Sequence, residues 1–202
     1  YPVEVDLQLL ALMAAYSLVT SISPGPNNTV LLTLSARFGH RGARAHLVGM
    51  VVGLSAMVIA MSAGLGAFFA AYPAVYQVMK YVGFAYVLYM AWRIYRSAIP
   101  QPGEDAGPPA TVWRSTLFQW VNPKAWIVIA TFVTAYIPVD LGPWGIALAL
   151  GMFIGFTMPG AVVWVFLGRL IARWLTTPRS QKVFTTVMAL ALVASMVPVI
   201  FL

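Results

Sequence analysis

Long apolar runs separated by short polar stretches make up most of this chain. An α-helix needs about 20 apolar residues to span the roughly 30 Å hydrocarbon core of a bilayer. Six stretches reach that length, over about residues 7–34, 47–70, 76–95, 116–137, 142–167 and 183–202. The pattern therefore predicts an all-α membrane protein with six transmembrane helices.

One segment of soluble character, residues 97–113, separates the third stretch from the fourth. It is rich in proline and glycine and contains Glu104 and Asp105, as expected of a loop. We predict that it is a cytoplasmic linker between two three-helix repeats, residues 1–96 and 114–202. Because each repeat has an odd number of spans, the two repeats would be inverted relative to each other, as in many secondary transporters.

The basic residues predict the orientation. Most of them lie in segments that would share one side of the membrane: Arg37, Arg41, Arg44, Arg93, Arg96, Arg114, Arg169, Arg173, Arg179 and Lys182. Cytoplasmic segments carry the excess of Lys and Arg, so this side is predicted to be cytoplasmic. Both termini would then be periplasmic, and the protein would be a multi-pass protein of the bacterial cytoplasmic (inner) membrane.

Composition agrees with a lipid environment. The chain is 61% hydrophobic and 8% charged, with a mean hydropathy of +0.85, whereas soluble domains are about 25% charged. The topology accounts for the net charge of +7, so we expect no nucleic-acid partner. The chain has no cysteine, which excludes disulfides and thiolate metal sites. The N-terminal segment has no basic residue before its apolar run, so we expect a retained helix rather than a signal peptide.

The first predicted helix contains a candidate binding site. Its sequence is interrupted by Pro24, Gly25, Pro26, Asn27 and Asn28. Two prolines around a glycine should unwind the helix, and in lipid such a break is tolerated only against protein or a water-filled cavity. The second half-helix would present free N–H groups suited to a carboxylate. The alternative is a structural kink satisfied by neighbouring helices.

The fourth predicted helix has a similar interruption at Asn122, Pro123 and Lys124. Both interruptions are predicted at a similar depth, so they could face one cavity and bind substrate together. Lys124 either contributes a cation to that site or extends toward the cytoplasmic surface. The aromatic residues near the two breaks are candidate cavity walls or packing anchors: Tyr86, Tyr89, Trp120 and Trp126.

Two further features are open to more than one interpretation. Pro159 and Gly160 predict a third break, in the fifth helix, which is either a hinge or an ordinary kink. His46 lies on a face shared with glycines and is either a hydrogen-bonded interface residue or a proton relay.

The acidic residues narrow the class of substrate. All five acidic residues lie in predicted loops or at the N-terminus. Binding a cationic side chain or a metal ion within a membrane normally requires a buried carboxylate. We therefore expect a neutral amino acid as substrate and no metal or other cofactor. No nucleotide-binding loop or catalytic motif is present, so the chain is predicted to be a secondary transporter and not an enzyme.

The motifs together resemble those of the LysE-type amino-acid exporter family, which includes homoserine/threonine and leucine exporters. The resemblance rests on Ser-Pro-Gly-Pro-Asn-Asn from Ser23, Arg-Gly-Ala-Arg from Arg41, the Gly49–Gly53 pair, the aromatic run from Lys80, and Asn-Pro-Lys-Ala-Trp from Asn122. It implies export of amino acids, driven by the membrane gradient, by a homodimer. Many members carry an aspartate directly after the second of these glycines, where this chain has Leu54.

The working hypothesis is export by alternating access between the two repeats, in a protein whose other partner is membrane lipid. Two alternatives stay open. The first is export of another small solute, such as an amino-acid analogue, a dipeptide or an organic acid. The second is a non-transporting membrane scaffold packed through its glycine faces.

Overall fold

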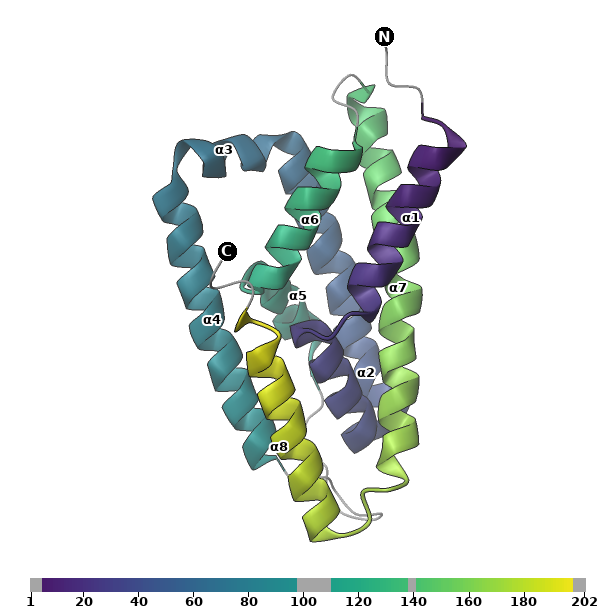
Figure 1. Cartoon of the computed structure of the whole chain (residues 1–202), viewed down its shortest axis with the longest axis vertical. Coiled ribbons are helices and arrows are strands. Elements are labelled where there is room, and N and C mark those ends of the chain that lie inside the picture. The colour runs from purple at the N-terminus through teal and green to yellow at the C-terminus, as the bar shows by residue number, and fades with distance from the viewer. Residues whose placement is uncertain (1–4, 98–109, 138–140, 198–202) are drawn as a thin grey trace.

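The computed structural model describes residues 5–97, 110–137 and 141–197, and these contain helices and no strand. The predicted all-α class is confirmed for this part of the chain. The helices, shown in Figure 1, are α1 (Leu7–Ile22), α2 (Pro26–Ala60), the π-helical turn η1 (Met61–Leu65), α3 (Gly66–Ala71), α4 (Pro73–Arg96), α5 (Val112–Trp120), α6 (Pro123–Tyr136), α7 (Pro143–Ala172) and α8 (Pro178–Ala194).

Helix α2 is two antiparallel segments joined at Gly39. A straight helix would place Asn27 and His46 about 28 Å apart, at 1.5 Å per residue. Their side chains instead lie 3.2 Å apart, between Nε2 of His46 and Oδ1 of Asn27. Gly39 makes the reversal with φ 67° and ψ −167°, a left-handed conformation that glycine adopts without steric cost. A single residue therefore connects the two segments where a longer loop was expected.

The chain turns again at the opposite end of the molecule. Gly64 has φ 107° within η1, and the short α3 then runs across the end of the bundle to reach α4 (Figure 1). Residues 47–70, expected as one span, are therefore divided among α2, η1 and α3. Most of the predicted 97–113 linker and the last residues of the predicted 183–202 helix lie outside the described residues.

The helices pack in two main groups that also touch each other. Helix α7 packs against α1 and both segments of α2, and α5 packs against α2. The core that these helices share with α6 contains Met13, Leu31, Met57, Ile129 and Phe132, all fully buried. Helices α4 and α8 form the second group, as a pair around a core of their own. The site described below lies in the first group.

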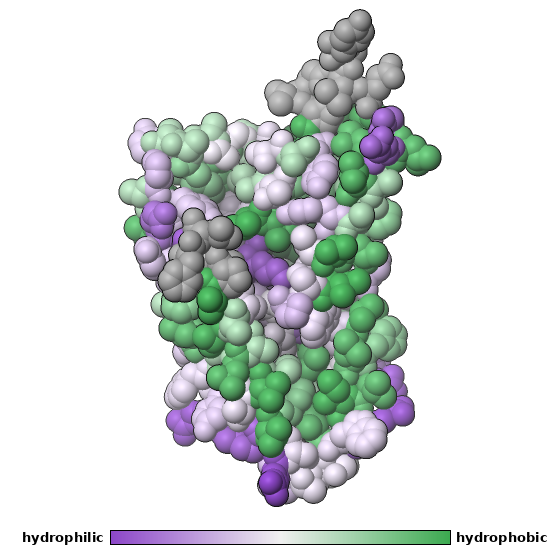
Figure 2. All heavy atoms as spheres, in the orientation of Figure 1, coloured by the Kyte–Doolittle hydropathy of each residue, from purple (hydrophilic) through white to green (hydrophobic). Residues whose placement is uncertain are grey.

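The outer surface of the bundle is apolar. Large hydrophobic side chains are exposed along α4, α7 and α8. Figure 2 shows wide hydrophobic areas on one face, with hydrophilic residues at the lower end and smaller hydrophilic patches higher up. Two helical stretches, Pro26–Ala71 and Pro143–Ala172, are long and apolar enough to cross a membrane, and α1 is a shorter apolar helix. Such a surface suits a lipid environment.

The break expected at Pro159 is absent. Helix α7 runs without interruption from Pro143 to Ala172 with Pro159 inside it, so the prediction of a broken fifth helix is corrected. A single proline removes one backbone N–H, and α7 is held on both sides of it by packing against α1 and α2.

Candidate functional site

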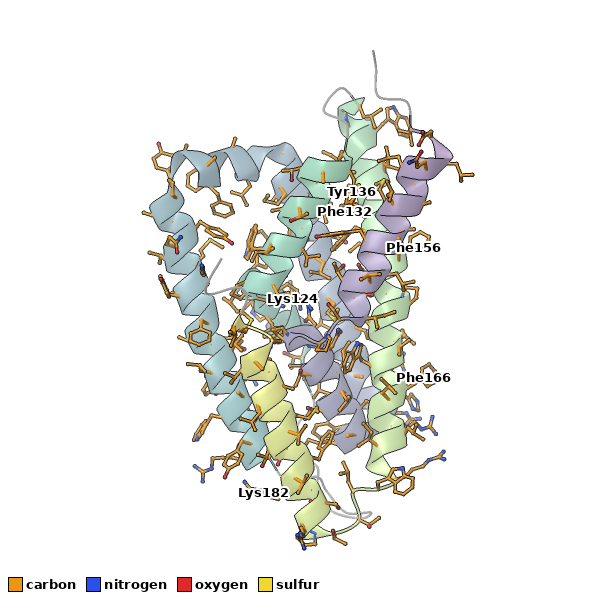
Figure 3. The ribbon with its side chains drawn as sticks, in the orientation of Figure 1. Lys124, Phe132, Tyr136, Phe156, Phe166 and Lys182 are labelled. Atoms are coloured by element: carbon orange, nitrogen blue, oxygen red, sulfur yellow. The ribbon has the colours of Figure 1, made fainter. Side chains whose placement is uncertain are left out.

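Two interrupted helical runs meet near the middle of the bundle. The first lies between α1 and α2, at Ser23–Gly25, and the second between α5 and α6, at Val121 and Asn122. Lys124 connects them, and Figure 3 shows it near the middle of the molecule. Its Nζ donates to Oγ of Ser23 at 2.8 Å, to the carbonyl of Ser23 at 3.2 Å and to that of Pro24 at 2.7 Å. The three donors of the ammonium group are therefore directed at the first break.

Asn28 and Ser23 also donate to carbonyl groups at the first break. Nδ2 of Asn28 donates to the carbonyl of Ser21 at 2.6 Å and to that of Ser23 at 2.7 Å. Oγ of Ser23 donates to the carbonyl of Thr20 at 2.7 Å. Such groups need partners, because an unpaired buried carbonyl costs about 1–3 kcal/mol. The side-chain amide of Asn28 therefore stabilises the break in this structure.

The second break is closed by residues next to it in the chain. The amide of Asn122 donates to the carbonyl of Gln119 at 3.2 Å. Nε1 of Trp126 donates to the carbonyl of Trp120 at 2.8 Å. Oδ1 of Asn122 accepts from the amide of Lys124 at 3.2 Å and so caps α6. Asn122 therefore serves as a helix cap.

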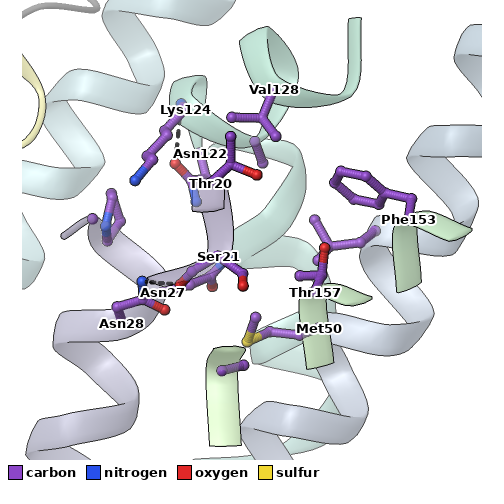
Figure 4. Close-up of a pocket in the computed structure, with 15 residues that line it drawn as sticks. Thr20, Ser21, Asn27, Asn28, Met50, Asn122, Lys124, Val128, Phe153 and Thr157 are labelled. Atoms are coloured by element: carbon purple, nitrogen blue, oxygen red, sulfur yellow. Dashed lines mark hydrogen bonds between the residues drawn. The ribbon is translucent and has the colours of Figure 1, made fainter. Parts of the chain in front are cut away.

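A cavity of about 60 Å³ lies beside both breaks (Figure 4). Its lining is Thr20, Ser21, Gly25, Pro26, Asn27, Asn28, Met50, Leu54, Asn122, Lys124, Ala125, Val128, Phe153, Thr157 and Ala161. Six of the predicted site residues are in this lining, whereas Pro24 and Pro123 are not. The lining includes no carboxylate, and Leu54 stands in the wall where the resemblance often implies an aspartate.

Free hydrogen-bond donors border this cavity at the start of α2. Gly25 precedes that helix, no side chain among the described residues caps it, and Pro26 has no N–H. The amides of Asn27 and Asn28 lie in the first turn, where intrahelical partners are missing. Thr157 adds a hydroxyl on the α7 side. This residue is 6% exposed, and its Oγ1 is buried without a hydrogen-bond partner in the described structure.

A buried hydrogen-bond network closes one side of the cavity. Nδ2 of Asn27 donates to Oε1 of Gln119 at 2.7 Å, and Nε2 of Gln119 donates to Oδ1 of Asn27 at 3.0 Å. Nε2 of Gln119 also donates to the carbonyl of Ser115 at 3.0 Å, which fixes the orientation of both amides. His46 completes the network through Oδ1 of Asn27 at 3.2 Å and Oγ of Ser115 at 3.0 Å.

A neutral His46 fits the orientation of these amides. Oδ1 of Asn27 is an acceptor, so Nε2 of His46 carries a hydrogen toward it. Nδ1 then accepts from the hydroxyl of Ser115, so a neutral imidazole satisfies every member. His46 is 2% exposed and Gln119 fully buried. The geometry is that of a hydrogen-bonded interface residue between α2 and α5.

A second, larger cavity lies on the other side of this network. It has a volume of about 500 Å³. Its lining is Val30, Thr33, Leu34, Arg37, Phe38, His46, Tyr86, Met90, Arg93, Ile94, Arg96, Ser97, Ala110, Arg114, Ser115 and Phe118. Four arginines and no acidic residue are among these. We call it the basic cavity, and the smaller one the central cavity.

The predicted aromatic and hinge residues are distributed among different places. Tyr86 borders the basic cavity, whereas Tyr89 is 46% exposed and lies against Trp92 and Arg93. Trp120 and Trp126 pack edge to face beside the second break and line neither cavity. Gly160 is buried against α1: an added Cβ would lie 1.8 Å from Oγ of Ser21. It is thus a close-packing position between α7 and α1.

Sequence reasoning missed three residues that the structure places here. Gln119 and Ser115 complete the network around His46, and Thr157 contributes the unpartnered hydroxyl. One signal was available: Ser115 and Gln119 are four residues apart, so they share a face of a helix otherwise rich in apolar residues. Two polar residues on one face of a membrane helix indicate a polar contact inside the bundle.

The broken helices, the apolar exterior and the central cavity define the class of protein, a helical membrane protein with an internal cavity beside two helix breaks. Comparison with known proteins agrees. The chain matches the LysE type translocator family over residues 18–199 and belongs to that family. The predicted family is thereby confirmed, and it is a family of translocators rather than enzymes. The chain is accordingly an integral membrane protein.

Individual relatives are similar over most of their length. The chain is 32% identical over 171 residues to the cysteine/O-acetylserine efflux protein of Salmonella typhimurium (strain LT2), a match that covers 82% of this chain and 85% of the relative. It is 31% identical over 170 residues to the protein of the same name from Escherichia coli (strain K12), with the same coverage. No solved structure matches the chain.

Proposed function

We propose that this protein exports a small neutral amino acid, of the cysteine or O-acetylserine kind, by alternating access. The relatives named as cysteine/O-acetylserine efflux proteins support the substrate class. The observation that carries the proposal is the central cavity, in which the uncapped start of α2 faces the unpartnered hydroxyl of Thr157. A largely apolar cavity with a few hydrogen-bond donors in its wall suits a small solute that carries acceptors.

The substrate carboxylate binds the amides of Asn27 and Asn28 in this proposal. A helix N-terminus offers free N–H groups and a favourable dipole to an anion. The ammonium group of the substrate donates to the hydroxyl oxygens of Thr20 and Ser21, which border the same cavity. Thr157 binds the substrate's own polar group. The lining has the Lys124 ammonium and no carboxylate, which disfavours a substrate with a cationic side chain.

The volume of the central cavity assigns the structure, in this proposal, to a closed state. A volume of about 60 Å³ is well below the roughly 300–1,000 Å³ of typical small-molecule pockets. Binding therefore needs the cavity to widen. The network of Asn27, His46, Gln119 and Ser115 separates it from the basic cavity, so loading from that side requires this network to open.

The contacts between helices support the inverted-repeat arrangement that this mechanism uses. An added Cβ at Gly160 of α7 would collide with Ser21 of α1, and one at Gly53 of α2 would lie 2.5 Å from Cγ of Gln119 of α5. In the first contact, α1, which precedes one break, meets α7, the helix that follows the α5–α6 pair. In the second contact, α5, which precedes the other break, meets the second segment of α2. The third helices of the two repeats, α4 and α8, also pair. The proposed exporter has six transmembrane spans, has both termini in the periplasm and works as a homodimer.

Counterflow in proteoliposomes tests the function. Vesicles are preloaded with L-serine, O-acetyl-L-serine, reduced L-cysteine, L-leucine or L-lysine, and uptake of a labelled neutral amino acid is followed. We expect accumulation with small neutral amino acids and none with lysine. Thr157→Val removes one hydroxyl at constant shape and should raise KM about tenfold, the equivalent of one lost hydrogen bond of about 1.4 kcal/mol.

The matched control is Thr185→Val. Thr185 is equally buried, at 1% exposure, but its Oγ1 donates to the carbonyl of Lys182 at 3.2 Å and borders neither cavity. Its KM should equal that of the wild type. Equal KM values for both variants would remove Thr157 from the site. No counterflow with any amino acid, in folded protein, would favour export of another solute or the scaffold alternative.

A further inference from the structure

The basic cavity has the composition of a binding site, and the proposed function does not use it as one. Its arginines come from three elements: Arg37 from α2, Arg93 and Arg96 from α4, and Arg114 from α5. They surround a volume of about 500 Å³. Asp6 is the only acidic residue in the described part of the chain, and it caps α1. None of the described carboxylates neutralises these four charges.

Arg37 adds an independent observation. Its Nε is buried and has no hydrogen-bond partner in the described structure, although its guanidinium stacks on the ring of Phe38 with Cζ 4.9 Å from the centroid. A buried N–H of a cation without an acceptor costs more free energy than a neutral one. An anionic oxygen in the basic cavity would satisfy it.

The position of the basic cavity connects it to the central one. His46 and Ser115 border the basic cavity, and Asn27 borders the central cavity. Nε2 of His46 and Oδ1 of Asn27 are 3.2 Å apart, so one layer of side chains separates the two spaces. A solute in the basic cavity is therefore next to the network that must open for loading.

We propose that the basic cavity is a second, outer binding site for the carboxylate of the exported solute. The inference rests on the proposed function and adds a step to it. We call the end of the molecule that contains the basic cavity the basic end. Solute from this end binds first between Arg37, Arg93 and Arg114, and then passes to the start of α2 when the network opens. Positive charge lining a cleft concentrates carboxylates and repels cationic amino acids, so the outer site also selects the substrate.

Direction-resolved transport tests this site. KM is measured in proteoliposomes with substrate supplied to the basic end, and again with substrate supplied to the opposite end. Arg37→Gln and Arg93→Gln should raise KM at the basic end by roughly five- to tenfold and leave the other KM unchanged. Arg93→Lys, which keeps the charge, should recover most of the loss. Arg93 is exposed, so its variants keep the test informative if Arg37→Gln fails to fold.

Arg173→Gln is the matched control, because Arg173 ends α7 at the same end of the molecule and borders neither cavity. It should leave both KM values unchanged. Salt gives a second readout. The Debye length is about 10 Å at 0.1 M ionic strength, so added salt should raise the wild-type KM at the basic end more steeply than that of Arg93→Gln. Equal salt dependence, or KM changes that are the same from both ends, would overturn the outer site.

A lipid phosphate presents the same chemistry as a carboxylate, and basic pockets between membrane helices bind such headgroups. The measurements are therefore repeated in pure phosphatidylcholine and in mixtures with phosphatidylglycerol. We expect the same KM in both. A wild-type KM at the basic end that rises with phosphatidylglycerol, with no rise in Arg93→Gln, would assign the cavity to lipid and overturn the proposal. Loss of wild-type counterflow in every lipid would instead refute the function on which the proposal rests.

Discussion

The two breaks in the helices differ in where their hydrogen-bond partners come from. At the α5–α6 break, the donors and acceptors that close it all lie within residues 119–126. At the α1–α2 break, Asn28 and Ser23 supply local donors, but the carbonyl groups of Ser23 and Pro24 also accept from Lys124, about one hundred residues away in the chain. One break is therefore closed by local contacts alone, and the other has a contact across the bundle as well.

The helices that follow the breaks differ in the same way. Both begin with a proline, Pro26 in α2 and Pro123 in α6. Asn122 caps α6, whereas no side chain in the described residues caps α2. An uncapped helix start inside a protein needs an acceptor, and the central cavity is next to it. A proline at a helix start therefore forms a structural joint at the α5–α6 break and a candidate anion site at the α1–α2 break.

Replacing Lys124 should have the largest effect, because it breaks the contact on which the first break depends. Lys124→Met keeps most of the side-chain volume but leaves the carbonyl of Pro24 without its donor, whereas the carbonyl of Ser23 keeps the amide of Asn28 at 2.7 Å. Leaving an acceptor unpaired costs about 1–3 kcal/mol, so we expect stability to fall by an amount in that range and transport to be lost. Thermal unfolding in detergent and counterflow measure the two effects.

Lys182→Met is the control for that substitution. Nζ of Lys182 donates to one carbonyl, that of Tyr95, at 3.2 Å in an exposed position, at the lower end of the molecule in Figure 3. Water can replace this bond, so the melting temperature should stay near the wild-type value. A Lys124→Met protein that melts and transports like Lys182→Met would show that the first break does not need its long-range donor.

The sequence predicted the residue types at both breaks because proline and glycine act locally. Pro24, Gly25 and Pro26 cannot continue a regular helix, and a lysine beside Pro123 inside an apolar stretch requires a partner. These rules need no knowledge of the fold. They identified six of the residues that line the central cavity.

The partners of those residues could not be predicted, because they depend on how distant helices pack. Nothing local joins Gln119 to Asn27, and Thr157 is one threonine among many until α7 is placed beside α2. At Pro159, by contrast, the local rule gave a wrong prediction. Its local rule predicts a break, yet packing against α1 and α2 holds α7 continuous. In both cases tertiary contact decided the role of the residue.

Two glycines, one packed against each break, allow the rigidity of the two breaks to be compared. An added Cβ at Gly83 of α4 would lie 2.3 Å from the carbonyl oxygen of Val121, a backbone atom of the second break. An added Cβ at Gly25 would meet the movable end of Lys124, 2.8 Å from Nζ. We expect Gly83→Ala to lower stability by about 2 kcal/mol through overpacking. Gly25→Ala should cost less stability but reduce transport, because it displaces the Lys124 amine.

Gly151→Ala provides the reference, since no atom lies within 4 Å of a Cβ added there. It should leave transport unchanged and stabilise α7 slightly, because alanine is the better helix former by up to about 1 kcal/mol. Melting temperatures and counterflow rates of the three variants are compared side by side. If Gly25→Ala lost more stability than Gly83→Ala, the α1–α2 break would be the more rigid of the two, contrary to our expectation.

The smallest expected effect is at the cap of α6. Asn122→Ala removes the acceptor of the Lys124 amide, and loss of an N-cap costs about 1 kcal/mol. If the second break is only a joint, stability should fall by that amount while KM stays at the wild-type value, although Asn122 borders the central cavity. Asn122→Ser, a good cap with a shorter side chain, should restore the melting temperature. A raised KM in both variants, measured well below their melting temperatures, would show that the Asn122 amide binds substrate, and the two breaks would then contribute jointly to one site.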